Sequence, residues 1–190
     1  KAAEGRWRAM ILTLVFTGVR SNELFGLRWS DVDLDRQVIH IRQALDRGTQ
    51  TFHDPKTETS KRSIPIIPML ANTLKEYKLS HPPRRDGSAN SDLVFHNGGM
   101  PIRAQTFVKY GLLPTLVRAK IIKPPITRKR HPFYEDRKYG GPHCYRHWYA
   151  SWCINAKEDG GLALDVKRVS ERLGHSSGNI TLDVYGHLFP

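Results

Sequence analysis

The stretch GPHCYRHWYASWCINA, residues 141–156, predicts a helix from which the rest of the fold can be worked out. Arg146 and His147 follow His143 by three and four residues, so the three side chains share one face of that helix. A second stripe, spaced i, i+4, i+7 and i+11, is expected to face the core: Tyr145, Tyr149, Trp152 and Ala156. The first face should then point to the rim of a cleft. Because neighbouring cation-capable side chains repel one another, an anion or water should lie between them.

The composition points to one basic globular domain. The chain has 190 residues, 39% of them hydrophobic and 25% charged, and a formal net charge of +12. That length is enough for a single domain with a real core, and no apolar run is long enough to span a membrane. The positive charge favours a polyanionic partner, nucleic acid before a membrane surface, although a basic protein without such a partner would have the same composition.

The two cysteines indicate a reducing compartment. Cys144 and Cys153 are nine residues apart on one predicted helix, which separates them by about 13 Å along its axis. They therefore cannot form a disulfide with each other. A reducing cytosol fits best.

The hydrophobic periodicity predicts a mostly α fold with a small antiparallel β-sheet of about three strands, an α+β class. Helices are expected at 5–17, from 21 to about 26–30 with Ser21 or Asn22 as its cap, and at 68–79, 103–122, 142–157, 164–174 and 179–188. The fourth of these should be interrupted near Pro114. Strands are expected at 37–44, 49–57 and 61–67, and the stretch 123–142 reads as irregular.

Two motifs in the first half could carry chemistry. In TGVRSNEL, Arg20 follows a helix end and Glu23 lies three residues on, where it could hold the guanidinium group in a bidentate pair. In PKTETSKRSIPI, Lys56 precedes a predicted hairpin turn and Lys61 competes with it for any role. Each motif alone has a structural explanation: an ion pair for the arginine, and a solvated surface position for the lysine.

Two more motifs lie near the C-terminus. In ERLGHSS, His175 follows Gly174 at a helix end, where it could simply interact with the helix dipole. In TLDVYGHLF, Tyr185 lies ten residues further on, and a tyrosine in an amphipathic helix usually packs in the core or at its rim. Taken together with the helix of residues 141–156, however, these motifs occur in a distinctive order.

That order resembles the catalytic domain of the tyrosine recombinases, the phage integrase family. The resemblance runs from LTLVFTGVRSNELFGLRWSDVD to ITLDVYGHL, nearly the whole chain. It implies a single catalytic domain over residues 1–190, without the N-terminal core-binding domain of the family. It also implies the following catalytic residues: Arg20, Lys56, His143, Arg146, His175 and Tyr185. Glu23 matches the acidic position that supports the first arginine.

The resemblance further implies a site-specific recombinase or integrase that cuts DNA by transesterification. Tyr185 would attack a backbone phosphate and form a 3′-phosphotyrosyl link. Arg20, Arg146 and His175 would hold the phosphate oxygens. His143 would act as the base and Lys56 as the acid, with no metal, ATP or other cofactor.

The expected partners are double-stranded DNA attachment sites, on which the full-length protein would act as a homotetramer, and no membrane. His147 could contact a DNA phosphate or a carbonyl group. The basic segment 128–130 could contact the DNA backbone through Arg128, Lys129 and Arg130, although a variable surface loop explains it as well.

Other functions are possible. A type IB topoisomerase would share the chemistry and the fold, and a DNA-binding relative could lack recombination activity. A zinc site on His143 and His147 has metalloprotease spacing, but the glutamate expected beside the first histidine is replaced by Cys144.

Overall fold

The computed structural model describes residues 2–46, 48–54, 60–84, 86–88, 90–128, 131–134 and 141–189. Its α-helices are α1 (Gly5–Thr17), α2 (Ser21–Phe25), α3 (Pro68–Ser80), α4 (Ala104–Thr106), α5 (Leu113–Arg118), α6 (His143–Ile154), α7 (Val166–Leu173) and α8 (Gly178–Tyr185). Shorter 3₁₀ turns occur at Trp29–Asp31, Lys157–Asp159 and Gly186–Leu188. In the described part of the chain, no helix is long and apolar enough to cross a membrane. The prediction of a mostly α fold with small antiparallel sheets is confirmed.

The largest sheet has three antiparallel strands in the order β1 (Val32–Asp33), β2 (Val38–Ile41) and β5 (Arg62–Pro65). Ile39 pairs with Ile64 across β2 and β5, and both side chains are fully buried. Three two-stranded ribbons complete the β structure: β3 (Ala44–Leu45) with β4 (Phe52–His53), β6 (His96–Asn97) with β7 (Met100–Pro101), and β8 (Ile126–Arg128) with β9 (His131–Phe133). Of the three predicted strands, the first and third pair in the main sheet, whereas the second pairs with β3.

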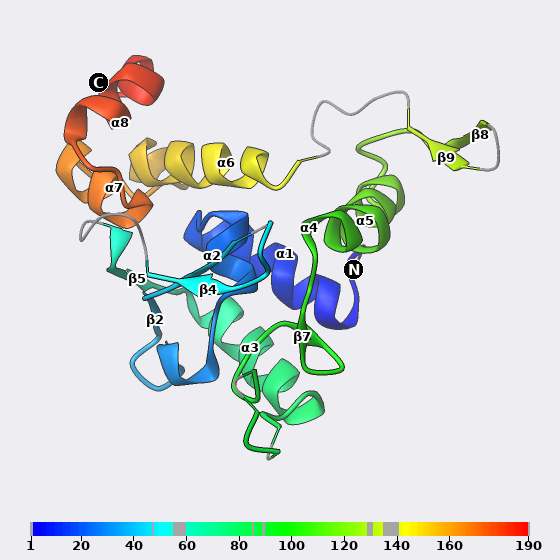
Figure 1. The fold of residues 1–190 in the computed structure, drawn as a ribbon. Coiled ribbons are helices and arrows are strands. Elements are labelled where there is room, and N and C mark those ends of the chain that lie inside the picture. The colour runs from blue at the N-terminus through cyan, green and yellow to red at the C-terminus, as the bar shows by residue number, and fades with distance from the viewer. Residues whose placement is uncertain are drawn as a thin grey trace.

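Helix α1 lies between α6 and α3 and packs against both (Figure 1). Met10 and Leu14, four residues apart on α1, are almost fully buried, as are Leu70 and Leu74 on α3. Tyr149 of α6 is fully buried on the other side. Burial of each of these leucine and methionine side chains stabilises the fold by about 1.5–3 kcal/mol. This packing fixes the position of α6 relative to the N-terminal part of the chain.

A glycine turn joins α1 to α2. Gly18 has φ +60°, a left-handed conformation that a residue with a Cβ adopts only at a cost. Its N–H donates to the carbonyl of Leu14 at 3.0 Å, and a Cβ at this position would collide with the ring of Tyr149. Glycine is therefore required here, and the tight turn brings Arg20 directly to the start of α2.

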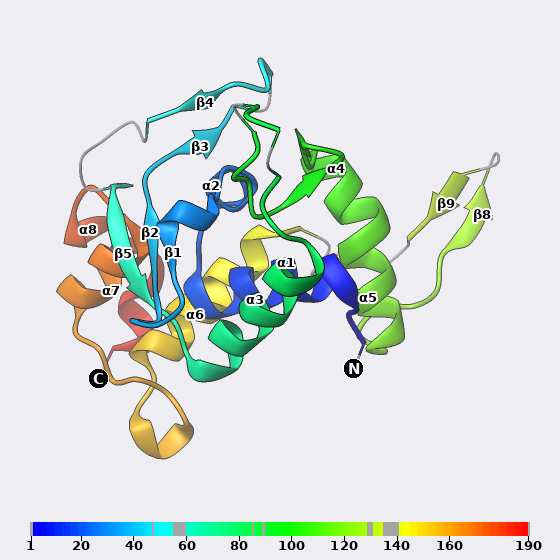
Figure 2. The ribbon, with the colours of Figure 1, turned by 90° about the horizontal axis from the view of Figure 1, so that it is seen from below.

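The C-terminal helices fold back onto the N-terminal half. Helix α7 packs against α6, α8 and strand β5, and Figure 2 shows β5 beside α7 at one end of the molecule. The reversal after α6 is held by backbone bonds, such as that from the N–H of Leu164 to the carbonyl of Cys153 at 2.8 Å. The start of α2, strand β5 and the end of α7 thus meet in one place.

Two expectations concern the middle of the chain. The α-helix is interrupted near Pro114, as expected, by a π-helical turn, Phe107–Leu112, after which the chain continues directly as α5. This turn supplies the irregular hydrogen bonding that a proline, which has no N–H, requires. The stretch 123–142 is not wholly irregular, since it contains the β8–β9 hairpin, which extends away from the helices (Figure 1).

Candidate active site

Arg20 is held at the N-cap of α2 by Glu23. Its backbone N–H donates to Oε2 of Glu23 at 2.7 Å, and Nη1 of its guanidinium group donates to Oε1 at 3.1 Å. Nη2 donates to the carbonyl of Gly174 at 3.2 Å. The expectation that Ser21 or Asn22 caps this helix is wrong, because Glu23 reaches back to the backbone of Arg20.

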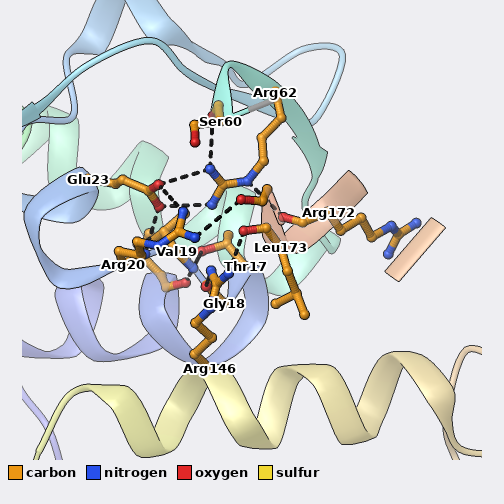
Figure 3. A network of polar contacts seen from close by, with 12 residues as sticks. Thr17, Gly18, Val19, Arg20, Glu23, Ser60, Arg62, Arg146, Arg172 and Leu173 are labelled. Carbon is orange, nitrogen blue, oxygen red and sulfur yellow. Dashed lines mark hydrogen bonds and ion pairs between the residues drawn. The ribbon is translucent and has the colours of Figure 1, made fainter. Parts of the chain in front are cut away.

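The bidentate partner of Glu23 is Arg62, a residue that the sequence analysis missed (Figure 3). Nη1 and Nη2 of Arg62 donate to the two carboxylate oxygens at 3.0 and 2.8 Å, and both side chains are buried. Burial alone would raise the pKa of Glu23, but the hydrogen bonds and charge of Arg62, with those of Arg20, lower it overall. Glu23 is therefore ionised at neutral pH and supports two arginines. The alternation of KRSIPI around buried Ile64 was the available signal, since it places Arg62 on a strand of the core sheet.

Three successive carbonyl groups at the C-terminus of α7 each accept a hydrogen bond from a different arginine, and Figure 3 labels the first two of them, Arg172 and Leu173. The carbonyl of Arg172 accepts from Nε of Arg62 at 2.8 Å, that of Leu173 accepts from Nη2 of Arg146 at 2.5 Å, and that of Gly174 accepts from Nη2 of Arg20 at 3.2 Å. The last carbonyls of a helix have no partner within the helix and carry its negative partial charge. The end of α7 therefore stabilises a cluster of cations that would otherwise repel one another.

Arg146 lies inside the protein rather than at the cleft rim that was expected. Its side chain is 3% exposed, and Nη1 donates to the carbonyl of Gly18 at 2.8 Å. Burial, then the charges of Arg20 and Arg62, lowers its pKa to about 9, so it remains protonated at neutral pH. The apolar stripe of the same helix is only partly as predicted, because Tyr149 is fully buried whereas Ala156 is exposed and lies beyond the helix end.

His175 lies directly after the end of α7. Nδ1 of its ring is 2.9 Å from the hydroxyl oxygen of Thr181 on α8. Burial, and then the charges of Arg146, Arg20 and Arg62, lowers the pKa of His175 to about 4. The imidazole is therefore neutral at neutral pH.

Tyr185, the last residue of α8, contacts His147 rather than His143. Its phenol oxygen is 2.9 Å from Nδ1 of His147, and its side chain is 5% exposed. Burial raises the pKa of the phenol, and the charge of Arg146 opposes this. The ring centroids of His143 and His147 are 4.9 Å apart with their planes nearly perpendicular, and burial, then the charges of His147 and Arg146, lowers the pKa of His143.

These side chains line one cavity of about 540 Å³. Its wall includes most of the predicted site: Arg20, Glu23, His143, Arg146, His147, His175 and Tyr185. Lys56 lies outside the described residues, as do Lys129 and Arg130. The backbone of Arg128 lies on β8, in the hairpin that extends away from the helices (Figure 1). Among the described residues, no three His, Cys, Asp or Glu side chains lie together as a metal site.

Solved structures with this fold define the class of protein. The XerA recombinase superposes with a TM-score of 0.64 over 98% of this chain and 58% of that chain, at 19% identity. The Tn1549 transposon integrase, solved in complex with a circular intermediate DNA, gives a TM-score of 0.65 over 93% of this chain and 53% of that chain, at 22% identity. The fold is therefore that of a tyrosine recombinase catalytic domain.

Sequence comparison gives the family. The Phage integrase family matches residues 1–190, and the chain belongs to this family. It is 27% identical to the Tyrosine recombinase XerC-like protein of Caldanaerobacter subterraneus subsp. tengcongensis over 97% of this chain and 46% of that protein. It is 29% identical to the ICEBs1 integrase of Bacillus subtilis over 92% of this chain and 43% of that protein. The chain thus spans less than half the length of these relatives, and the family resemblance expected from the sequence is confirmed.

Proposed function

We propose that the protein containing this chain is a site-specific recombinase that cuts and rejoins double-stranded DNA through a 3′-phosphotyrosyl intermediate. The observation that carries the proposal is the cavity itself, in which Tyr185 lies with Arg20, Arg146 and His175. A nucleophile beside a cluster of fixed cations suits attack on a phosphodiester. Membership of the phage integrase family supports the same reaction.

The reaction exchanges one phosphodiester for another. The phenol oxygen of Tyr185 attacks the scissile phosphorus, a bond to the 3′-phosphate forms, and the bond to the 5′ oxygen breaks. The phenol proton leaves, and the 5′ oxygen takes up a proton. Because the bond energy is kept in the phosphotyrosyl link, rejoining is the reverse reaction and needs no ATP, metal or other cofactor.

Arg20 and Arg146 would bind the non-bridging phosphate oxygens, and His175 would add a third donor. Each arginine is already hydrogen-bonded to fixed carbonyl groups, so its guanidinium group is oriented before DNA arrives. Pre-oriented donors of this kind are effective because they need no reorganisation during the reaction. In another enzyme, removal of one such donor costs about 2.7–4 kcal/mol.

Proton transfer requires a base and an acid. A free tyrosine has a pKa near 10, so only about 0.1% is phenolate at pH 7. We assign the base to His147, which the sequence analysis treated as a DNA contact, because its Nδ1 lies 2.9 Å from the phenol oxygen. His143, the base expected from the sequence, would support the ring of His147. Lys56 remains the proposed acid for the leaving 5′ oxygen.

The proposed partner is double-stranded DNA at an attachment site, which the net charge of +12 favours. Arg128, Lys129 and Arg130 are proposed to contact phosphates. The full-length protein is proposed to act as a homotetramer on DNA in the bacterial cytoplasm.

The test is a covalent protein–DNA complex. The natural protein that contains this chain is incubated with a nicked duplex carrying the junction sequence of its own genetic element, and covalent products are resolved on a denaturing gel. We expect a covalent band that Tyr185→Phe abolishes and that Tyr110→Phe, a change at an exposed tyrosine outside the cavity, leaves intact. A band that survives Tyr185→Phe would contradict the assignment. Relaxation of unrelated supercoiled plasmid would favour the type IB topoisomerase alternative. Sequence-selective binding without cleavage would favour a DNA-binding relative that lacks recombination activity.

A further inference from the structure

Thr181 differs from the other buried threonines of the described chain. Four of them donate the hydroxyl hydrogen to the carbonyl four residues earlier in their own helix: Thr13, Thr17, Thr73 and Thr115. The hydroxyl oxygen of Thr181, which is fully buried, instead lies 2.9 Å from Nδ1 of His175. The carbonyl four residues before it, that of Ser177, accepts from the hydroxyl of Ser170 at 3.3 Å. The side chain of Thr181 is thus directed at the histidine.

The direction of this hydrogen bond follows from the needs of both groups. A neutral imidazole carries one proton, so Nδ1 either donates to Thr181 or accepts from it. Among the described residues, Nδ1 of His175 is the only acceptor found for the Thr181 hydroxyl hydrogen. If Nδ1 donated, a buried O–H would be left without a partner, which is rare in folded proteins and unfavourable. The bond therefore runs from Thr181 to Nδ1.

We propose that Thr181 sets the tautomer of His175, keeping Nδ1 bare and the ring proton on Nε2. Nδ1 is occupied by Thr181, so Nε2 is the nitrogen left for the cavity that His175 lines. Only an Nε2–H can donate to an anion there, because the opposite tautomer would present a lone pair to it. Thr181 is a positioning residue that acts through His175, and its effect on DNA cleavage rests on the proposed function.

Because its surroundings keep the ring of His175 neutral, its tautomer decides which ring nitrogen can donate a hydrogen bond. The partial burial of the ring, and then the guanidinium groups of Arg146 and Arg20, lower the pKa of His175 and keep the imidazole neutral at neutral pH. An imidazolium ion would donate from both nitrogens and would not need to be oriented by a hydroxyl. A neutral ring has only one N–H, so a single hydrogen bond at the other nitrogen decides whether His175 is a donor or an acceptor toward the cavity.

The tautomer can be read without DNA. Long-range ¹H–¹⁵N NMR of the ¹⁵N-histidine-labelled protein at neutral pH distinguishes a protonated from a bare ring nitrogen. We expect His175 to carry its proton on Nε2 in the unchanged protein and in Thr181→Ser, and to become a mixture of tautomers in Thr181→Val. Thr73→Val, which removes a buried hydroxyl of α3 that donates to a carbonyl, is the matched control and should leave His175 unchanged. A proton on Nδ1 in the unchanged protein, or the same tautomer in Thr181→Val, would overturn the proposal.

Cleavage of the nicked duplex tests the consequence. We expect Thr181→Val to lower the rate at saturating DNA by about 10-fold or more, toward the rate of His175→Ala, with DNA affinity little changed. Thr181→Ser should restore the rate, and Thr73→Val should match the unchanged protein. Full activity in Thr181→Val, with a changed tautomer, would refute the positioning role. If the unchanged protein itself does not cleave DNA, the proposed function fails while the NMR result still decides the tautomer.

Discussion

Nδ1 of His147 and the phenol oxygen of Tyr185 lie 2.9 Å apart, which joins the middle of the cationic helix α6 to the end of α8. A base must be within hydrogen-bond reach of the proton that it accepts, so this contact selects between two neighbouring histidines. His143 packs against His147, with 4.9 Å between the ring centroids, and is not the residue bonded to the phenol.

We expect His147→Asn to lower the rate of DNA cleavage by about 100-fold or more, because an amide can hydrogen-bond to the phenol but cannot accept its proton. His143→Asn, the matched control, should lower the rate much less, because the ring of His143 is not the one bonded to the phenol. Single-turnover cleavage of the nicked duplex at neutral pH decides the matter, and the opposite pattern in the two variants would restore His143 as the base.

The buried pair of Glu23 and Arg62 predicts a large effect on stability. Arg62→Met should lower the free energy of unfolding by about 3–5 kcal/mol, because it leaves the carboxylate of Glu23 in the interior without its bidentate partner. The double variant Glu23→Gln with Arg62→Met should lose less than Arg62→Met alone. Arg168→Met removes the partner of Asp165 in an exposed pair, and should cost about 0–1 kcal/mol. Urea unfolding of the four proteins measures these values, and equal losses for the two single arginine variants would contradict the prediction.

The lowered pKa of His175 predicts that stability falls as the pH is lowered. Its folded pKa of about 4 is below its ordinary value of about 6.5, so between these values the unfolded chain binds a proton that the folded chain does not. The contribution of His175 to the free energy of unfolding should therefore be fully present above about pH 6.5 and be lost as the pH falls toward 4. His143, whose pKa is also lowered, acts in the same direction. We expect the free energy of unfolding to fall less between pH 7 and pH 5 in His175→Asn than in the unchanged protein. An equal fall would mean that His175 does not contribute.

Lys56 and Lys61 can be distinguished by the leaving group. In a DNA substrate with sulfur in place of the bridging 5′ oxygen, the leaving group departs as a thiolate without protonation. This substrate should therefore restore cleavage to a variant that lacks the general acid. We expect rescue of Lys56→Ala and none of Lys61→Ala. The ammonium group of Lys61 lies 3.6 Å from the carboxylate of Asp54, which gives that lysine a structural partner. Rescue of Lys61→Ala alone would show that the lysine was wrongly chosen.

The hairpin region should contribute phosphate contacts. Changing Arg128, Lys129 and Arg130 to Ala should reduce the magnitude of the slope of log affinity against log salt concentration by up to about 2.7, since each phosphate contact contributes about 0.9 to it. Lys75→Ala on α3 is the control for a general loss of charge. Titration of duplex DNA at several salt concentrations gives the slopes, and an unchanged slope in the triple variant would assign the hairpin no role in binding.

The periodicity of single segments was enough to predict the helices. Helix α1 has the predicted bounds, and α3 extends one residue further, because apolar residues recur at helical spacing and Pro68 occupies a first turn. The hairpin in 123–142 was not predicted, since only Ile126 and Phe133 at its two ends are apolar and the residues between them, which are polar, basic or proline, show no alternation. The interruption of the α-helix near Pro114 was predicted, but its form, a π-helical turn, was not, because sequence rules do not anticipate such a turn.

The members of the site were easier to predict than their contacts. Arg20, Arg146 and Tyr185, which the family resemblance named, line one cavity, while their catalytic roles stay predictions. Arg62 was missed because its partner, Glu23, is 39 residues away and had already been assigned to Arg20. Long-range contacts of this kind depend on how β5 packs against α2 and α7, which no local pattern encodes.

The three arginines at the end of α7 also determine when the cavity can form during protein synthesis. Arg20, Arg62 and Arg146 are each synthesised before the carbonyl that accepts their hydrogen bond, which lies 154, 110 and 27 residues later in the chain, respectively. A nascent chain that has not reached this point has the cations without the helix end that stabilises them, and contacts so distant in sequence form late. Tyr185 is made later still. The nucleophile and the assembled cationic cluster therefore cannot come together until the ribosome has synthesised the chain as far as Tyr185.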